Sequence, residues 1–128
     1  MMTPKELAIQ LLRSVNERDP ESALRLFAGQ AELIFPRHAP RTVYRGSAEL
    51  LEFFDWLVAN LPQHTVAADR VHENARSATV EFETTGTSRS GHEFDNIGAV
   101  VIDVDGGLIQ AVRVYLDTED LRRVLEVA

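Results

Sequence analysis

Apolar side chains in the first half of the chain recur at the spacing of an α-helix. This periodicity predicts three helices, at approximately residues 4–15, 20–28 and 47–60. Thr3-Pro4-Lys5-Glu6 is a capping box at the start of the first helix, because the threonine hydroxyl and the glutamate carboxylate can each bond a free N–H group. Gly29 can end the second helix by taking a left-handed conformation.

After Pro62 the pattern changes to the alternation of β-strands. The strands that it predicts span residues 64–72, 78–83, 94–104 and 108–116. Asp105-Gly106-Gly107 is a hairpin turn between the last two of these strands. One earlier strand, at residues 33–35, ends at Pro36, and Thr118 is placed to cap a short terminal helix.

This order of elements predicts an α+β fold, in which the helices pack against one face of a curved antiparallel sheet. The length of 128 residues is that of one domain, and neither a repeat nor a linker interrupts the chain. We therefore expect residues 1–128 to form a single domain. The composition, 45% hydrophobic and 26% charged, is that of a globular protein rather than a disordered one.

The strand at residues 94–104 differs from the others because it is apolar on both faces. An antiparallel sheet with one face in water should alternate instead. We therefore expect a homodimer that forms through the outer face of the sheet, with Ile97, Ala99 and Val101 near the interface. Arg113 and Tyr115 of the next strand are expected beside them. The alternative is that the terminal helix or a loop covers this face.

The charge balance restricts the partners of the protein, and the absence of cysteine restricts its chemistry. Lys and Arg number 13 against 20 Asp and Glu, and the net charge of −7 disfavours binding to nucleic acid and to anionic membranes. Without cysteine, the chain cannot form disulfides, thiolate zinc sites or thiol nucleophiles. No basic and apolar leader is present, and no window is apolar over the roughly 18 residues that a membrane span needs. We therefore expect a soluble, cytoplasmic protein.

Several segments, taken in order, resemble those of one known family. They are Val15-Asn16-Glu17-Arg18-Asp19, Leu26-Phe27-Ala28, Phe35-Pro36, Tyr44-Arg45-Gly46-Ser47-Ala48-Glu49, Asp105-Gly106-Gly107-Leu108-Ile109 and Arg113-Val114-Tyr115-Leu116-Asp117. The set resembles the nuclear transport factor 2-like superfamily, in particular its bacterial SnoaL-like and ketosteroid-isomerase-like branch. The resemblance implies a cone-shaped fold, in which a bent sheet wraps around N-terminal helices, leaves an apolar pocket at its wide end and pairs through its outer face. It specifies the fold more than the activity, because this fold hosts many chemistries.

The resemblance also implies where catalytic groups should lie, and here those positions are apolar. The base of a ketosteroid isomerase corresponds to Phe35, its tyrosine to Leu11 and its protonated acid to Val100. The aspartate of SnoaL-like polyketide cyclases corresponds to Val114. We therefore expect the standard acids of the family to be absent.

Two further kinds of site find no support in the sequence. Limonene-epoxide-hydrolase-like relatives place an arginine and an aspartate two residues apart on an earlier strand, where this chain has Glu81 and Glu83. We expect this like-charged pair on a solvated face or at the rim of the dimer. No two of the 4 histidines have the helical i, i+4 spacing of a zinc site, and no glycine-rich turn joins a strand to a helix. Neither a metal nor a cofactor is predicted.

The ligand-binding residues that we expect form an apolar wall with a few polar groups. They are Phe35, Trp56, His64, Phe82, Asn96, Val100 and Val114. Asn96 shares the inward side of its strand with Val100 and could orient a carbonyl or hydroxyl group, or it could satisfy backbone groups at a strand end. His64 either reaches the pocket mouth as an acid or base, or lies exposed at the end of its strand. Trp56 belongs to the pocket wall or to the core.

Together these features favour a protein that binds a small apolar or oxygenated organic molecule in a hydrophobic pocket. An alternative is a SnoaL-like enzyme, of the isomerase, cyclase or epoxide-hydrolase type, with unusual acid–base residues such as His64 or Asn96. A second alternative is a structural dimer module. The sequence assigns no catalytic residue and identifies neither the ligand nor a reaction.

Overall fold

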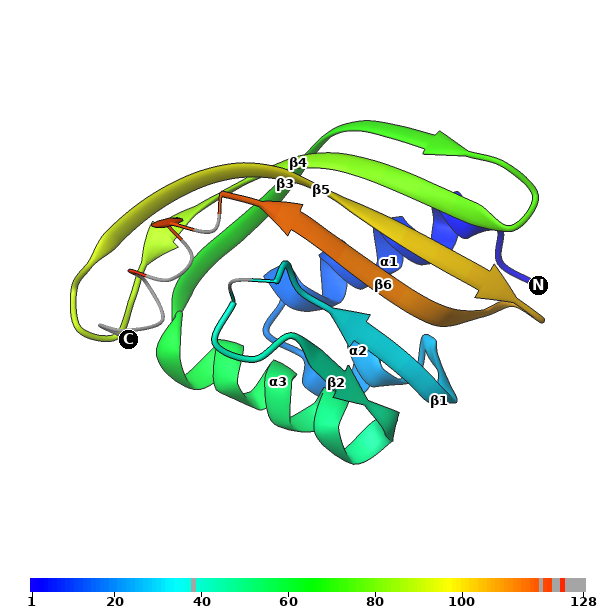
Figure 1. The fold of residues 1–128 in the computed structure, drawn as a ribbon, viewed down its shortest axis with the longest axis horizontal. Helices are drawn as coiled ribbons and strands as arrows, with labels where there is room; N and C mark the ends of the chain where they lie inside the picture. The colour runs from blue at the N-terminus through cyan, green and yellow to red at the C-terminus, as the bar shows by residue number, and fades with distance from the viewer. Residues whose placement is uncertain (38, 118, 121–122, 124–128) are drawn as a thin grey trace.

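A curved sheet with helices on its inner side makes up the protein (Figure 1). The computed structural model describes residues 1–37, 39–117, 119–120 and 123. In these residues the elements follow in the order α1 (Pro4–Asn16), α2 (Pro20–Leu24), β1 (Phe27–Ile34), β2 (Val43–Arg45), α3 (Gly46–Asn60), β3 (Gln63–Glu73), β4 (Ser77–Thr87), β5 (Glu93–Asp105) and β6 (Leu108–Leu116). The α+β class predicted from the sequence is confirmed. None of the described helices is long and apolar enough to cross a membrane.

The strands form one six-stranded sheet in the order β2-β1-β6-β5-β4-β3. The antiparallel meander from β3 to β6 is the one that the alternating pattern predicts. β1 pairs with β6 in parallel, and β2 pairs with β1 in antiparallel. Irregularities in the pairing of β3 with β4 and of β5 with β6 are of the kind that bends a sheet. The sheet therefore has a concave face, on which α1 packs against β3, β4 and β5, and α3 packs against β1.

Helix α1 begins at the capping box and is fixed to the sheet at its other end. The Thr3 N–H donates to Glu6 Oε1 at 3.1 Å, and the Glu6 N–H donates to Thr3 Oγ1 at 3.2 Å. Leu7 in the inner face of the helix is fully buried. At the last turn, Asn16 Nδ2 donates to the carbonyl of Val66 at 2.9 Å, and Asn16 Oδ1 accepts from the Val66 N–H at 2.8 Å. These two bonds join α1 to the edge strand β3.

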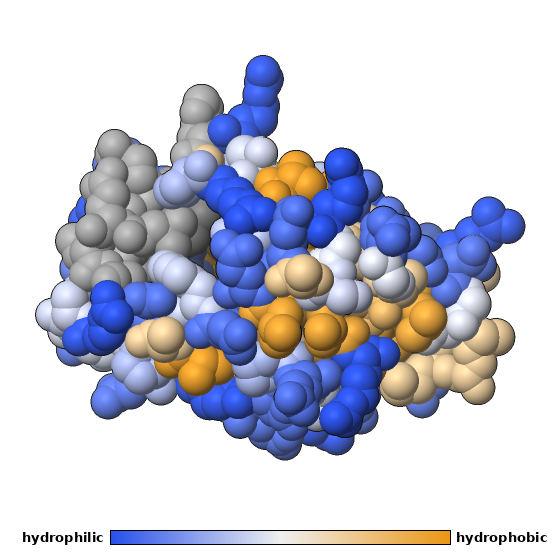
Figure 2. All heavy atoms as spheres, turned by 90° about the horizontal axis from the view of Figure 1, so that it is seen from below, coloured by the Kyte–Doolittle hydropathy of each residue, from blue (hydrophilic) through white to orange (hydrophobic). Residues whose placement is uncertain are grey.

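Helix α3 is apolar over a broad surface because it meets two environments. Leu50 is buried in the hydrophobic core, whereas Phe53, Phe54 and Trp56 border the cavity described below. Seen from the side of α3, the molecular surface is largely hydrophilic, with patches of hydrophobic atoms between the polar side chains (Figure 2). Val58 of this helix is 37% exposed. The breadth of the apolar surface thus reflects core and cavity together.

Some element boundaries differ from those that the sequence predicts. Helix α2 ends at Leu24, and the chain enters β1 at Phe27, so Gly29 lies inside a strand and has no left-handed conformation. The reason is that Phe27 pairs with Ile109 of β6, a contact that the periodicity of one segment does not reveal. The sequence pattern does not predict β2, a three-residue strand that pairs with β1. The helix start predicted at Thr118 lies outside the described residues.

The inner and outer rows of β5 differ sharply in exposure. Asn96, Val100 and Ile102 on the inner row are buried, whereas Ile97 on the outer row is 71% exposed. Tyr115 of the neighbouring strand β6 is 52% exposed. An apolar strip on the convex face is therefore open to solvent in the single chain.

Candidate functional site

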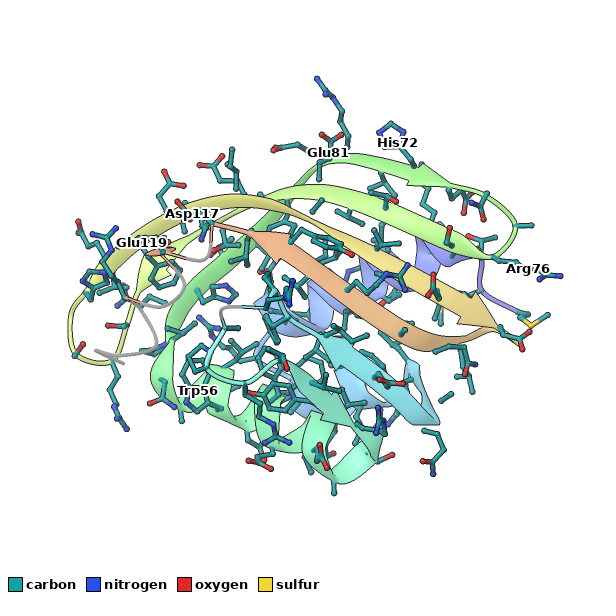
Figure 3. The ribbon with its side chains drawn as sticks, viewed as in Figure 1. Trp56, His72, Arg76, Glu81, Asp117 and Glu119 are labelled. Atoms are coloured by element: carbon teal, nitrogen blue, oxygen red, sulfur yellow. The ribbon has the colours of Figure 1, made fainter. Side chains whose placement is uncertain are left out.

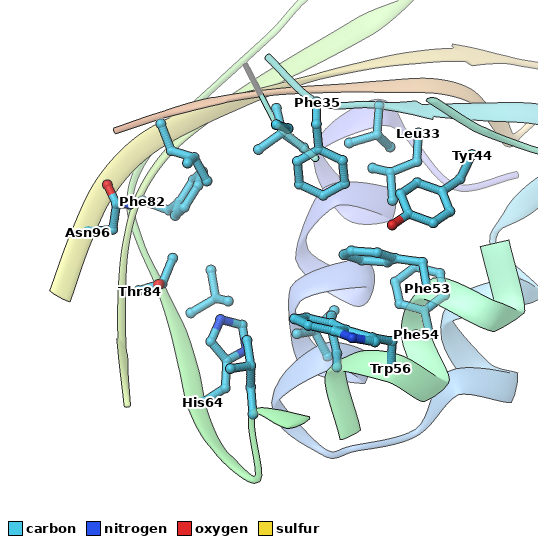
Figure 4. Close-up of a pocket in the computed structure, with 18 of the residues that line it drawn as sticks. Leu33, Phe35, Tyr44, Phe53, Phe54, Trp56, His64, Phe82, Thr84 and Asn96 are labelled. Atoms are coloured by element: carbon cyan, nitrogen blue, oxygen red, sulfur yellow. The ribbon is translucent and has the colours of Figure 1, made fainter. Parts of the chain in front are cut away.

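A cavity of about 500 Å³ lies between the concave face of the sheet and the helices α1 and α3 (Figure 4). Each layer of the fold contributes to its wall, for example Leu11 of α1, Phe53 of α3 and Phe82 of β4. Because side chains alternate along a strand, Phe82 and Thr84 point to the same inner side of β4. The curvature of the sheet and the alternation of its strands thus position the wall.

Aromatic rings form the wall on the side of α3, β1 and β2. The ring of Phe53 lies 5.2 Å from that of Phe35 and 5.1 Å from that of Tyr44, centroid to centroid. Tilted ring pairs at such separations are favourable contacts, so these rings hold one another in place. Trp56 continues the wall along α3 and lies across the cavity from His64 (Figure 4). This side of the cavity is therefore a preformed apolar surface.

His64 belongs to the opposite wall, where its imidazole ring is largely enclosed. The ring lies 5.8 Å from that of Phe94, and Nδ1 is buried and makes no hydrogen bond with the described residues. Burial, with a smaller effect of the nearby Arg18 charge, lowers the pKa of His64 to about 4. The imidazole is consequently neutral at pH 7 and can donate one hydrogen bond and accept another.

A carboxylate reaches the same cavity from the segment that follows β6. Asp120 lines the cavity, its side chain is 13% exposed, and its Oδ2 accepts a hydrogen bond from Asn96 Nδ2 at 3.2 Å. Asn96 also donates to the carbonyl of Asp117 and accepts from the Asp117 N–H, each at 3.2 Å. The amide of Asn96 therefore anchors this segment and holds the Asp120 carboxylate at the cavity wall.

The rim near β2 carries a second charged group, Arg41, whose charge is already compensated. Its guanidinium donates to Glu49 at 2.7 Å and to Glu52 at 3.3 Å, and it stacks over the Tyr44 ring at 4.1 Å. Burial raises the pKa of Tyr44, although Arg41 acts in the opposite direction. The phenol is therefore protonated at neutral pH, and Tyr44 lines the cavity with its hydroxyl turned toward the interior (Figure 4).

The structure places most of the expected ligand-binding residues around this one space. Phe35, Trp56, His64, Phe82, Asn96 and Val114 border the cavity. Val100 does not, and its expected position in the wall is corrected: it lies in the hydrophobic core. It pairs with Val80 and Val114 in the middle of the sheet, where β4 and β5 are packed against α1.

Several lining residues have polar groups that the sequence reasoning did not select. Thr84 could have been found from its alternation with Phe82 on β4. Arg41 and Tyr44 lie in and beside an irregular segment with no periodic signal. Asp120 follows the predicted helix start at Thr118, where an acid is common because the helix dipole favours it, so only the structure reveals its place at the cavity.

The acidic pair on β4 is not part of the cavity. Glu81 lies on the outer surface beside His72 (Figure 3), with Glu81 Oε2 at 3.5 Å from His72 Nε2 and 3.9 Å from a guanidinium nitrogen of Arg70. Glu83 shares a hydrogen bond with Asp95, which raises the pKa of Glu83. Both acids therefore belong to the convex face. Within the part of the chain that the structure describes, no cluster of three His, Asp or Glu side chains is arranged to hold a metal ion.

Comparisons with known proteins place this geometry in a family. A SnoaL-like domain matches residues 8–112. An NTF2-like protein of unknown function from Burkholderia pseudomallei superposes with a TM-score of 0.87 at 16% identity, over 97% of this chain and 98% of that one. A putative SnoaL-like polyketide cyclase from Jannaschia sp. gives a TM-score of 0.78 at 15% identity, over 99% and 95% of the two chains.

One structural neighbour is described as an enzyme of polyether biosynthesis. The epoxide hydrolase/cyclase-like enzyme SalBIII, described in pyran ring formation in the polyether salinomycin, has a TM-score of 0.77 at 20% identity, over 91% of this chain and 92% of that one. No curated protein matches the chain in sequence. At these identities the neighbours establish the fold, and the sequence match over residues 8–112 establishes the family. The chain belongs to the SnoaL-like domain family and has the nuclear transport factor 2-like fold.

Proposed function

We propose that this protein binds a small, largely apolar molecule that carries at least one polar group. The observation that carries the proposal is the cavity of about 500 Å³, whose wall is aromatic and aliphatic apart from a few polar side chains. A space of this size and lining is typical of small-molecule sites. Removing apolar ligand surface from water supplies the main driving force, and the polar groups fix orientation.

Apolar residues stand at the positions where relatives in this family carry catalytic acids. This supports a binding function rather than one of the reactions known in the family. Leu11, Phe35 and Val114 all border the cavity, and each stands where the resemblance implies a proton-handling group. Loss of one positioned acid or base commonly costs about 10²–10⁴ in rate. The standard mechanisms therefore lack their principal groups at these places.

The position of Asp120 favours a second candidate, an enzyme with a rearranged acid–base set. A carboxylate and a neutral imidazole that line the same cavity are groups that can accept and donate protons. In this case activity on a substrate of the isomerase or cyclase type would depend on Asp120, and Asp120→Asn would lower kcat by about 10²-fold or more. Equal binding of an inert analogue by both proteins would locate that loss in the chemical step.

Binding can be measured without a label, because Trp56 is the sole tryptophan and borders the cavity. We expect 1-adamantanol and 2-adamantanone, which are compact and have no aromatic absorption, to change the emission of Trp56 saturably. They should also raise the melting temperature, since a ligand that binds the folded state stabilises it.

A matched pair of variants tests where binding occurs. Val114→Phe adds a phenyl ring to the cavity wall, and Gln110→Phe adds the same ring to an exposed position of the same strand. We expect Val114→Phe to weaken binding at least about tenfold and Gln110→Phe to leave it unchanged. If neither compound binds the parent protein, or if Val114→Phe binds as tightly as the parent, the proposed function is wrong.

A further inference from the structure

We infer that the cavity selects ligands whose head group donates a hydrogen bond, an alcohol or an amine, over carboxylic acids of the same skeleton, and that Asp120 makes this selection. The inference rests on the proposed function and identifies the ligand class that the cavity takes. The described part of the wall offers free hydrogen-bond acceptors at Asp120 and no unpaired cation.

Asp120 retains acceptor capacity at the cavity. A carboxylate offers about four lone-pair positions. One oxygen accepts from Asn96 Nδ2 at 3.2 Å, and the other faces Arg123 at 3.4 Å. The Arg123 side chain is 58% exposed, and ion pairs at such positions are weak because water screens them. Positions therefore remain at Asp120 for a ligand N–H or O–H group.

The described wall offers no uncompensated cation to a ligand carboxylate. Its charged residues are Asp120 and Arg41. Arg41 bonds two carboxylates of α3, so its charge is already balanced. An anionic ligand would thus meet a wall whose one cation is already bonded to two carboxylates and whose other charged group, Asp120, is itself an anion. Burial of an unpaired charge is strongly unfavourable.

The remaining polar groups of this wall are neutral and suit the same head group. Thr84 is buried and pairs across the sheet with Asn96, which holds Asp120. His64, whose Nδ1 is buried without a hydrogen bond among the described residues, can accept from a hydroxyl or donate to its oxygen. A hydroxyl group both donates and accepts, and so it suits a wall that combines an acceptor-only carboxylate with neutral groups of both kinds.

The placement of Asp120 is more than a by-product of anchoring the segment. Asn96 already bonds both backbone groups of Asp117, and these two bonds fix the chain there. The carboxylate of Asp120 adds a charge to the wall, which anchoring alone does not require. Removing this charge should therefore alter which head group binds.

The test uses four compounds with one hydrocarbon cage: 1-adamantanol, 1-adamantanamine, 2-adamantanone and adamantane-1-carboxylate. Dissociation constants are measured at pH 7.5 through Trp56 emission and checked by calorimetry. We expect the alcohol or the amine to bind at least about tenfold more tightly than the carboxylate, and more tightly than the ketone. The alcohol and amine arms distinguish a neutral donor from a cationic one.

Two variants assign the effect to one side chain. Asp120→Asn keeps the size of the side chain and removes its charge, and we expect it to strengthen carboxylate binding relative to the alcohol by about tenfold. Glu119→Gln removes one charge from the neighbouring position, which is exposed, and should leave the ratio unchanged. Melting temperatures verify that both variants are folded.

The outcomes separate the inference from the proposed function. If the carboxylate or the ketone binds the parent protein as tightly as the alcohol and amine do, the inference is overturned while the proposed function stands. Equal changes in Asp120→Asn and Glu119→Gln would overturn the role of Asp120. Absence of binding by all four compounds would overturn the proposed function itself.

Discussion

His64 combines a buried ring with a nitrogen that has no hydrogen bond among the described residues. A buried polar atom without a partner costs about 1–3 kcal/mol of stability. A ligand that supplies the missing bond recovers part of this cost on binding. Because the ring is buried, protonation of His64 also changes the free energy of unfolding.

The pH dependence of stability should report on His64. Its pKa is about 4 in the folded protein, against an ordinary value of 6.5. Between these values the unfolded chain takes up a proton that the folded protein does not, so stability is complete above about pH 6.5 and falls as the pH drops toward 4. At pH 4.5 we expect a loss of about 2–3 kcal/mol from this group.

Urea unfolding at pH 7.5 and 4.5 measures this effect. His64→Gln should be less sensitive to acid than the parent protein by that amount. His72→Gln is the control, because the His72 side chain is 68% exposed. Identical pH dependence in the parent and in His64→Gln would contradict the prediction.

Much of the cavity wall could be predicted from the sequence, because alternation fixes which side of a strand a residue faces. The inward position of Asn96 follows from this rule, and the structure places it at the cavity. Its bonding to Asp117 and Asp120 could not be predicted, since they follow β6 and reach Asn96 only through the folding of the chain. Val100 shows the converse limit: alternation gave its side correctly, but not the helix that covers it.

The attachment of α1 to β3 protects an edge of the sheet. β3 is the last strand in the sheet order, and an edge strand presents unpaired backbone groups. At Val66 the side chain of Asn16 bonds both of these groups. One side chain thus joins two elements and occupies part of an open edge.

Asn16→Ala should therefore destabilise the protein by about 1–3 kcal/mol, since two hydrogen bonds are lost. Chemical denaturation measures the change. Faster hydrogen exchange at the Val66 amide would localise the effect to the edge strand. An unchanged stability together with unchanged exchange would show that water replaces the amide without cost.

The approach of β5 to its neighbours requires glycine at position 98. A Cβ atom there would lie 2.2 Å from the carbonyl oxygen of Tyr115 and 3.1 Å from Cζ of Phe82. The first contact is with backbone, which cannot rotate away. We expect Gly98→Ala to destabilise the protein by about 1–3 kcal/mol, measured by thermal or urea unfolding. Gly29→Ala is the control, because nothing lies within 4 Å of a Cβ there.

The elements that the sequence predicts well are those whose pattern is local. The capping box, the apolar stripe of α1 and the alternation of β4 can each be read within one segment. The start of β1 at Phe27 could not be predicted in this way, because its apolar residues fit a helix as well as a strand and the pairing with Ile109 decides. β2 has three residues, too few for a periodic pattern, so its pairing with β1 determines its conformation.

The apolar strip on the convex face, with Ile97 and Tyr115 in it, supports the proposal of a homodimer. Ile97 is 71% exposed and Tyr115 is 52% exposed on adjacent strands. Between the same strands Arg113 pairs with Asp103, so its charge is compensated on this face. A second copy of the chain would remove the strip from water.

We expect light scattering to report a dimer at tens of micromolar (an order of magnitude suited to an interface of standard size). Ile97→Lys should shift the equilibrium to the monomer by at least about tenfold. Ile9→Lys changes an apolar residue that is 38% exposed on α1, outside the convex face, and should leave the dimer intact. A monomeric parent protein at this concentration would contradict the prediction.

The parallel pairing of β1 with β6 has a consequence for synthesis on the ribosome. Phe27 of β1 meets Ile109 of β6, which is the last in sequence of the strands that the structure describes. Until β6 has left the exit tunnel, β1 lacks its neighbour in the centre of the sheet order, and the apolar groups meant for the concave face have no complete surface to cover them. Contacts so distant in sequence form slowly. We therefore expect the nascent chain to complete its fold only after β6 has left the exit tunnel, and to depend on chaperones while it waits.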